Sequence, residues 1–141
     1  MAARERLTDW TSATAPSLED FERIGKVALA SLPEAFLKRA GEILIRVADF
    51  PDDDVLDEME AETPFDILGL FQGIGLAHDD AVPRSGQLPN MIWLYRRPIL
   101  DYWAEHEEAL GAVIAHVLIH EIGHHFGLSD DDMEAIEAAA G

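Results

Sequence analysis

Residues 116–130 read HVLIHEIGHHFGLSD and hold four of the six histidines in this chain of 141 residues. They overlap a segment, residues 105–126, that has no proline and carries apolar side chains at helical spacing, which predicts one long helix. His120 and His124 are four residues apart, so on this helix they share a face, one turn apart. Two imidazoles placed in this way can bind one tetrahedral metal ion. The histidine spacing therefore requires a helix through this part of the chain.

Glu121 follows the first of these histidines and points about 100° further round the helix. From there it can reach a water bound on the ion, as the general base does in the H-E-x-x-H arrangement. A catalytic zinc also needs a third protein ligand and an open position. Asp130 can supply this ligand only if the chain reverses at Gly127, because a straight helix would carry it about 15 Å away from His120. Asp131 is the alternative ligand, since a run of acids also suits the start of a last helix.

His116 extends the same stripe but is not expected to join the site. His116 and His124 are two turns apart, about 12 Å along the axis, so they cannot both bind one ion. We expect His116 to line the cleft or to form a hydrogen bond. His116, Tyr95 and Tyr102 are also candidates for the electrophile that polarises a substrate carbonyl, although packing is the simpler interpretation of both tyrosines.

The rest of the chain predicts helices, then strands, then the long helix and a short last one. Ser17 and Asp20 form a capping box before an amphipathic helix, and Gly41 ends a second, shorter helix. Three segments predict strands, the second of them in the centre of the sheet: EILIRVADF (42–50), FDILGLFQG (65–73) and MIWLYRR (91–97). A short edge strand at Ile74–His78 is an alternative fourth. This order indicates an α+β fold with one sheet covered by helices.

Several smaller elements follow from the same patterns. In the third strand the expected two faces are Met91, Trp93 and Tyr95 on one side and Ile92, Leu94 and Arg96 on the other, with Pro98 as its end. Ser129, with Asp132 three residues on, is expected to cap the last helix. The acidic residues 52–54 are expected to start a helix. Residues 1–16 are expected to form a flexible N-terminal arm and residues 17–141 a single domain.

Charge and composition narrow the choice of partners. The formal net charge of −18 repels phosphate backbones, so we expect no nucleic-acid partner. The absence of cysteine excludes thiolate metal sites and a cysteine nucleophile. We find no run of about 18 uncharged apolar residues and no apolar segment in MAARERLTDW. We therefore expect no membrane span and no secretory signal, and a cytoplasmic location.

The segment HEIGHHFGLSD resembles H-E-x-x-H-x-x-G-x-x-[HD], the extended zinc signature of the metzincin-like metalloproteases. With the MIWLYRRP strand just upstream, the chain is similar to the minimal zincin family of small bacterial zinc metallopeptidases over roughly residues 17–138. The resemblance implies a reduced zincin-like fold, with a small mixed sheet of three or four strands, a long active-site helix and flanking helices. It implies one zinc ion per chain, held by His120, His124 and Asp130, with Glu121 as general base, and a peptide or protein substrate.

The resemblance leaves three functions open. The first is a zinc-dependent metallopeptidase that uses a zinc-activated water. The second is a zinc-bearing interaction module without turnover, because larger metzincins place a Met-turn and a second subdomain after the motif, whereas eleven residues follow Asp130 here. Met133 is a candidate remnant of that methionine beneath the ion. The third is another zinc hydrolase, similar to an RNase-like family with related ligand spacing, although that family lacks an equivalent of Glu121.

Overall fold

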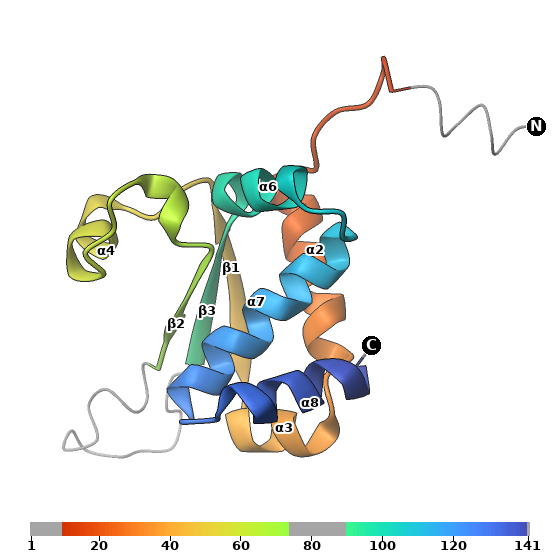
Figure 1. Ribbon diagram of the computed structural model, residues 1–141, viewed down its shortest axis with the longest axis vertical. Helices are drawn as coiled ribbons and strands as arrows, with labels where there is room; N and C mark the ends of the chain where they lie inside the picture. The colour runs from red at the N-terminus through yellow and green to blue at the C-terminus, as the bar shows by residue number, and fades with distance from the viewer. Residues whose placement is uncertain (1–9, 74–89, 141) are drawn as a thin grey trace, which may run out of the picture.

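The computed structural model describes residues 10–73 and 90–140 (Figure 1). The helices and strands, in chain order, are α2 (Leu18–Ala30), α3 (Glu34–Ala40), β1 (Ile43–Ala48), α4 (Asp53–Glu58), the 3-10 helix η1 (Pro64–Asp66), β2 (Gly69–Gln72), β3 (Asn90–Tyr95), α6 (Arg96–Glu105), α7 (Leu110–His125) and α8 (Asp130–Ala140). The alternative strand at Ile74–His78 and the first nine residues of the expected arm lie outside the described residues. Within those ranges, no helix is long and apolar enough to cross a membrane.

The three strands form one mixed sheet in the order β1-β3-β2. β1 runs parallel to β3, with Ile43 opposite Asn90. β2 runs antiparallel to β3, with Gly69 opposite Leu94. The chain therefore has the expected α+β fold with a small mixed sheet and flanking helices.

The position of β2 differs from the prediction. Residues 65–73 were expected to form the central strand, but in the part of the chain that the structure describes β3 pairs with both other strands and β2 lies at an edge. The apolar residues of this segment pack against a helix rather than between two strands. Phe71 packs on His125 of α7, with tilted rings whose centroids are 4.1 Å apart. A strand covered in this way reads as apolar although it pairs with one strand alone among the described residues.

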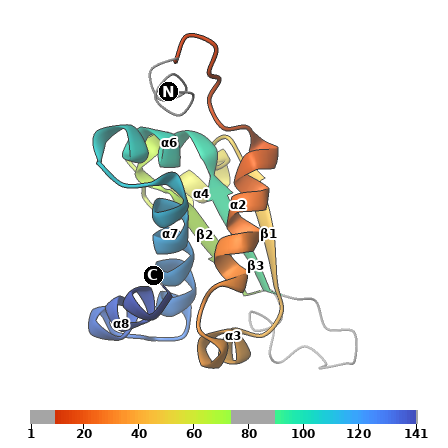
Figure 2. The same ribbon diagram turned by 90° about the vertical axis from the view of Figure 1, so that its right-hand side faces the viewer.

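Two helices cover one face of the sheet. Figures 1 and 2 show α2 and α7 side by side, with the three strands behind them in the second view. α2 approaches the sheet closely at Gly25, where a Cβ would lie 3.0 Å from Leu94 Cδ1 and 3.3 Å from Ile45 Cγ2. The absence of a side chain at this position therefore sets the distance between α2 and the sheet.

The central strand β3 has the alternation that its sequence predicts. Ile92 and Leu94 point to the helices and are 0% exposed. On the other face Trp93 is half-buried and donates a hydrogen bond from Nε1 to Gln72 Oε1 of β2, 3.1 Å away. Arg96, expected to continue the strand, instead begins α6.

The expected long helix over residues 105–126 is α7, which begins at Leu110 instead of residue 105, and residues 96–105 form a further helix, α6, that the sequence did not predict. α6 begins directly after β3 and ends at Glu105, and α7 begins at Leu110. The residues His106 and Ala109 both have extended backbones and separate the two helices without a proline. Pro98, expected to end the strand region, lies in the first turn of α6, where the missing N–H has no helical acceptor to lose. The long helix therefore starts later than predicted, and α6 precedes it as a separate helix.

The predicted helix ends agree closely with the structure. Ser17 and Asp20 form the expected capping box at α2, since each accepts a hydrogen bond from the other's backbone N–H. Asp52 caps α4 by accepting a hydrogen bond from the backbone N–H of Val55, so the acidic run is a helix start. Gly41 ends α3 with a φ of 73°, a left-handed conformation that favours glycine.

Candidate metal centre

The helix α7 has a buried side and a more exposed side. Its buried residues are Val113, Ile114, Val117, Leu118, Ile119, Ile122 and Gly123. The remaining stripe carries His116, His120 and His124. The ring centroids of His116 and His120 are 4.0 Å apart, and those of His120 and His124 are 5.8 Å apart. This confirms the prediction from the sequence spacing that the three histidines share one face of the helix.

The chain reverses after α7 at Gly127, as the metal-site prediction requires. Gly127 has a φ of 73°. Its N–H donates to the carbonyl of His124 over 3.1 Å, and the N–H of Leu128 donates to the carbonyl of Gly123 over 2.9 Å. These two bonds define a Schellman motif, in which a left-handed glycine satisfies the last helical carbonyls. The turn leads to α8, which lies against α7 in Figure 1.

The helix α8 is held against α7 by Met133. Ser129 and Asp132 form the expected capping box at the start of α8. Met133, one residue later, is 0% exposed. A Cβ at Gly123 would lie 2.5 Å from the sulfur of Met133. The side chain of Met133 therefore occupies the space beside Gly123, a residue that lies between His120 and His124 in the sequence.

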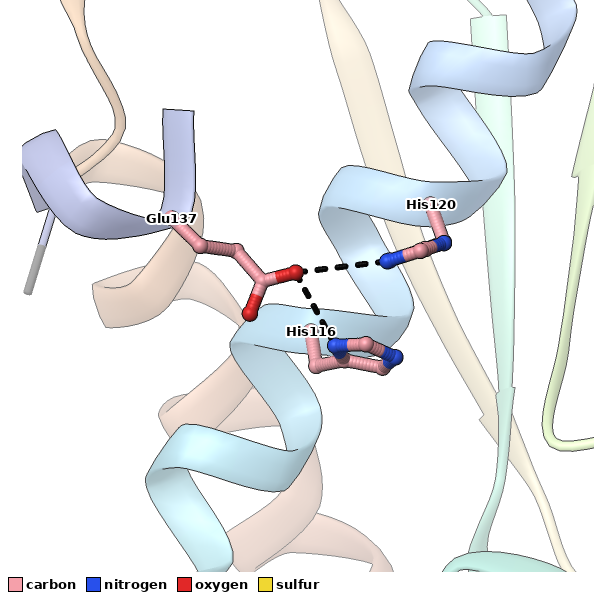
Figure 3. A group of neighbouring side chains, drawn as sticks. All are labelled: His116, His120 and Glu137. Atoms are coloured by element: carbon pink, nitrogen blue, oxygen red, sulfur yellow. Dashed lines mark hydrogen bonds and ion pairs between the residues drawn. The ribbon is translucent and has the colours of Figure 1, made fainter. Parts of the chain in front are cut away.

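The structure brings one carboxylate to the histidine stripe, and it is Glu137. Among the described residues, His116, His120 and Glu137 are the one group of three potential metal-binding side chains whose donor atoms all lie within 4.8 Å of one another. Oε1 of Glu137 lies 3.0 Å from His116 Nδ1 and 3.2 Å from His120 Nε2 (Figure 3). His116 therefore forms the hydrogen bond that was expected of it.

Sequence reasoning did not single out Glu137. It lies 17 residues from His120, and no motif links the two positions. One signal was available, because Glu137 is four residues after Met133 and shares its face on α8. Once Met133 points to α7, Glu137 must point to it as well.

Asp130 is the first residue of α8 and is exposed, as are Asp131 and Asp132. Asp132 is engaged in the capping box with Ser129, so its carboxylate has a structural role. Asp130 and Asp131 lie in the same first turn of α8. The choice of Asp130 as third ligand, with Asp131 as the alternative, stays a prediction.

Glu121 faces the sheet edge rather than α8. A Cβ at Gly69 of β2 would lie 3.5 Å from Glu121 Cγ and 2.6 Å from Val117 Cγ1, so β2 packs closely on α7 beside this glutamate. Burial raises the pKa of the Glu121 carboxyl above its ordinary value, and the neighbouring His124 partly offsets this by lowering it. A carboxylate with a raised pKa is a stronger base.

The two tyrosine candidates have different surroundings. Tyr95 is 3% exposed, and burial raises its pKa to about 12, with smaller contributions from the charges of Asp52 and Glu121. Tyr102 stacks on His106, with ring centroids 3.8 Å apart. The charge of Glu121 therefore contributes to the raised pKa of Tyr95. With this pKa the phenol of Tyr95 keeps its proton at neutral pH and can donate a hydrogen bond.

The fold and this helix agree with a comparison with known families. The sequence model of the family described as zincin-like metallopeptidase matches residues 40–140. This range holds all three strands, α7 and α8, and it covers more than half of the chain. The chain therefore belongs to the zincin-like metallopeptidase family. No curated protein matches the chain.

Proposed function

We propose that the chain is a zinc-dependent metallopeptidase in which His120, His124 and Asp130 hold zinc and Glu121 is the general base. The observation that carries the proposal is the continuous helix through the H-E-x-x-H segment, followed by the left-handed Gly127 and a returning helix. Together with membership of the family, this is the backbone that a third ligand ten residues after His120 needs.

The side chains present fit zinc by their chemistry. Two imidazoles one helical turn apart and a carboxylate make a donor set typical of catalytic zinc, which leaves one position open. His120 lies on a part-buried face, and the acids at the start of α8 follow the turn. When bound, zinc would supply Lewis-acid polarisation of a scissile carbonyl and would lower the pKa of water towards 7.

Glu121 would accept the proton of the attacking water and later return it to the leaving amine. Burial of its carboxyl supports this role, because it raises the proton affinity of the carboxylate. Tyr95, Tyr102 and His116 remain the candidates for the hydrogen-bond donor to the substrate carbonyl.

The edge strand β2 would hold the peptide. Among the described residues β2 pairs with β3 on one side, and no strand pairs with its other side. An extended peptide can add to such an edge through backbone hydrogen bonds. Since Gly69 of β2 lies against Glu121, a peptide on this edge would pass close to the proposed base.

The net charge of −18 favours a peptide over RNA as substrate, because it repels phosphates. The interaction module without turnover is the alternative, and it predicts zinc binding without hydrolysis.

Two neighbouring aspartates test the ligand set. Asp130→Ala should weaken zinc binding at least about 10-fold and abolish peptide hydrolysis. Removal of a residue that hydrogen-bonds to a zinc ligand already weakens binding by about 10-fold or more, and removal of the ligand itself should have at least this effect. Asp131→Ala is the matched control and should leave both unchanged. Zinc affinity is measured by competition with a chelator, and hydrolysis with a peptide library. Equal zinc affinity and equal activity of the two variants would show that Asp130 is not a ligand.

A further inference from the structure

Glu137 holds two histidines through a single carboxylate oxygen. His116 Nδ1 and His120 Nε2 both lie close to its Oε1, at 3.0 Å and 3.2 Å. Two ligand atoms of one tetrahedral zinc are separated by roughly 3.3 Å, which follows from metal–ligand distances near 2.0–2.1 Å. The two separations between Glu137 and the histidines are therefore close to those between two ligands of one zinc ion, and all three donor atoms lie within 4.8 Å of one another (Figure 3).

We propose that His116, His120 and Glu137 form a second position for a divalent transition-metal ion, and that this position shares His120 with the catalytic one. The donor set of two imidazoles and one carboxylate is that of zinc and related ions. The three side chains come from two helices, His116 and His120 from α7 and Glu137 from α8. Met133 packs between these two helices. The proposal rests on the proposed function only for the identity of the catalytic position.

The two positions exclude one another because both need His120. His120 directs its Nε2 at Glu137, so an ion held there uses the imidazole that the catalytic ion also requires. The chain should thus bind one ion at a time, in either position. Glu137 must release His120 before the catalytic position can fill.

An ion in the second position would be remote from the proposed base. At about 100° per residue, Glu121 is about 60° from His124 round the helix but about 140° from His116. Glu121 also faces β2, whereas Glu137 approaches from α8. An ion in the second position would therefore not lie beside Glu121 and would take no part in the proposed hydrolysis.

Solvent and ions can reach this position through a groove. Between α2 and α7 lies a groove of about 560 Å³ with mostly apolar walls, and His116 and Glu137 form part of its lining. The side chain of His116 is 46% exposed. An ion in this position would thus have an open side on which water completes its coordination.

Removal of the catalytic ligands isolates the second position. In the full chain, His124→Ala with Asp130→Ala leaves His116, His120 and Glu137 intact. This double variant should still bind one Zn²⁺, more weakly than the parent. Adding Glu137→Gln should weaken the remaining binding at least about 10-fold, because it removes a ligand. Adding Glu134→Gln, an exposed glutamate of the same helix, is the control and should change nothing.

The readout is Zn²⁺ affinity and stoichiometry by calorimetry, with circular dichroism to verify folding. A double variant that binds no Zn²⁺, or that binds it equally well with Glu137→Gln, would overturn the proposal. Two ions per parent chain would overturn the exclusion. If the double variant does not fold, Asp130→Ala alone takes its place with the same expectations.

The outcome is independent of hydrolysis. Loss of Zn²⁺ on Glu137→Gln in the double variant, with a parent that cleaves no peptide, supports the second position and rejects the peptidase. Cleavage by the parent, with a double variant that binds no Zn²⁺, supports the peptidase and rejects the second position.

Discussion

The contact between Gly123 and Met133 sets the distance between α7 and α8, and replacing Gly123 by alanine tests it. The new Cβ would lie 2.5 Å from the sulfur and 2.9 Å from Cγ of Met133, whose side chain is fully buried. Overpacking of this kind costs about 1–3 kcal/mol. Alanine in a helix is favoured over glycine by about 1 kcal/mol. We therefore expect Gly123→Ala to lower the free energy of unfolding by up to about 2 kcal/mol.

Removal of Met133 should reverse the sign of this effect. Met133→Ala alone should cost about 2–5 kcal/mol, because it leaves a cavity. For Gly123→Ala added to that variant, the two close contacts with Met133 are gone, and of the three nearest atoms Leu128 Cδ1 remains, at an ordinary 3.7 Å. The helix preference then acts alone, and the second substitution should raise the free energy of unfolding by about 1 kcal/mol.

Urea unfolding followed by circular dichroism measures these differences. A chelator is present throughout, because bound zinc would stabilise the native state and mask them. Gly111→Ala in the same helix is the control: no atom lies within 4 Å of its Cβ, so it should be neutral or stabilising. If the effects of Gly123→Ala and Met133→Ala simply add, the two residues do not make the contact described.

Three further predictions concern the surroundings of the site. Gly69→Ala should destabilise by about 1–3 kcal/mol in urea unfolding, since its Cβ would lie 2.6 Å from Val117 Cγ1, and an unchanged midpoint would refute this packing. Gly127→Ala should lower the free energy of unfolding by about 1 kcal/mol and should also weaken zinc binding. Gly41→Ala is the control: Gly41 has the same φ of 73° but is far from the motif in sequence, so this substitution should lower stability alone. Equal zinc affinity of the two variants would count against the role of the turn at Gly127. The Tyr95 pKa of about 12 exceeds the ordinary value of 10, so its contribution to stability is present below pH 10 and is lost as the pH rises towards 12; the urea midpoint of the parent should fall more over this window than that of Tyr95→Phe, and parallel curves would contradict the shift.

The local features of this fold follow from the sequence. Capping boxes at Ser17 and Ser129 involve residues three apart, so a short segment contains the whole interaction. Gly127 is predictable for a similar reason, since the motif requires a reversal where glycine is the residue that best adopts a positive φ. The shared face of His120 and His124 follows from helical geometry alone.

The features that the sequence did not reveal depend on distant contacts. β2 reads as a central strand because α7 covers its apolar side chains, and a covering helix gives the same pattern as a neighbouring strand. Glu137 reaches His120 because α8 packs on α7, where Met133 is buried against Gly123.

The most direct test of the proposed function is Glu121→Gln, measured for zinc binding and for peptide hydrolysis on the same preparation. The amide keeps the size of the side chain and removes its basicity. We predict unchanged zinc affinity and hydrolysis that is lower by roughly 10²-fold or more, the usual scale for a lost general base. Loss of zinc would place Glu121 among the ligands, and full hydrolytic activity with zinc retained would place the base elsewhere; either result would contradict the assignment of Glu121 as the base beside a zinc ion.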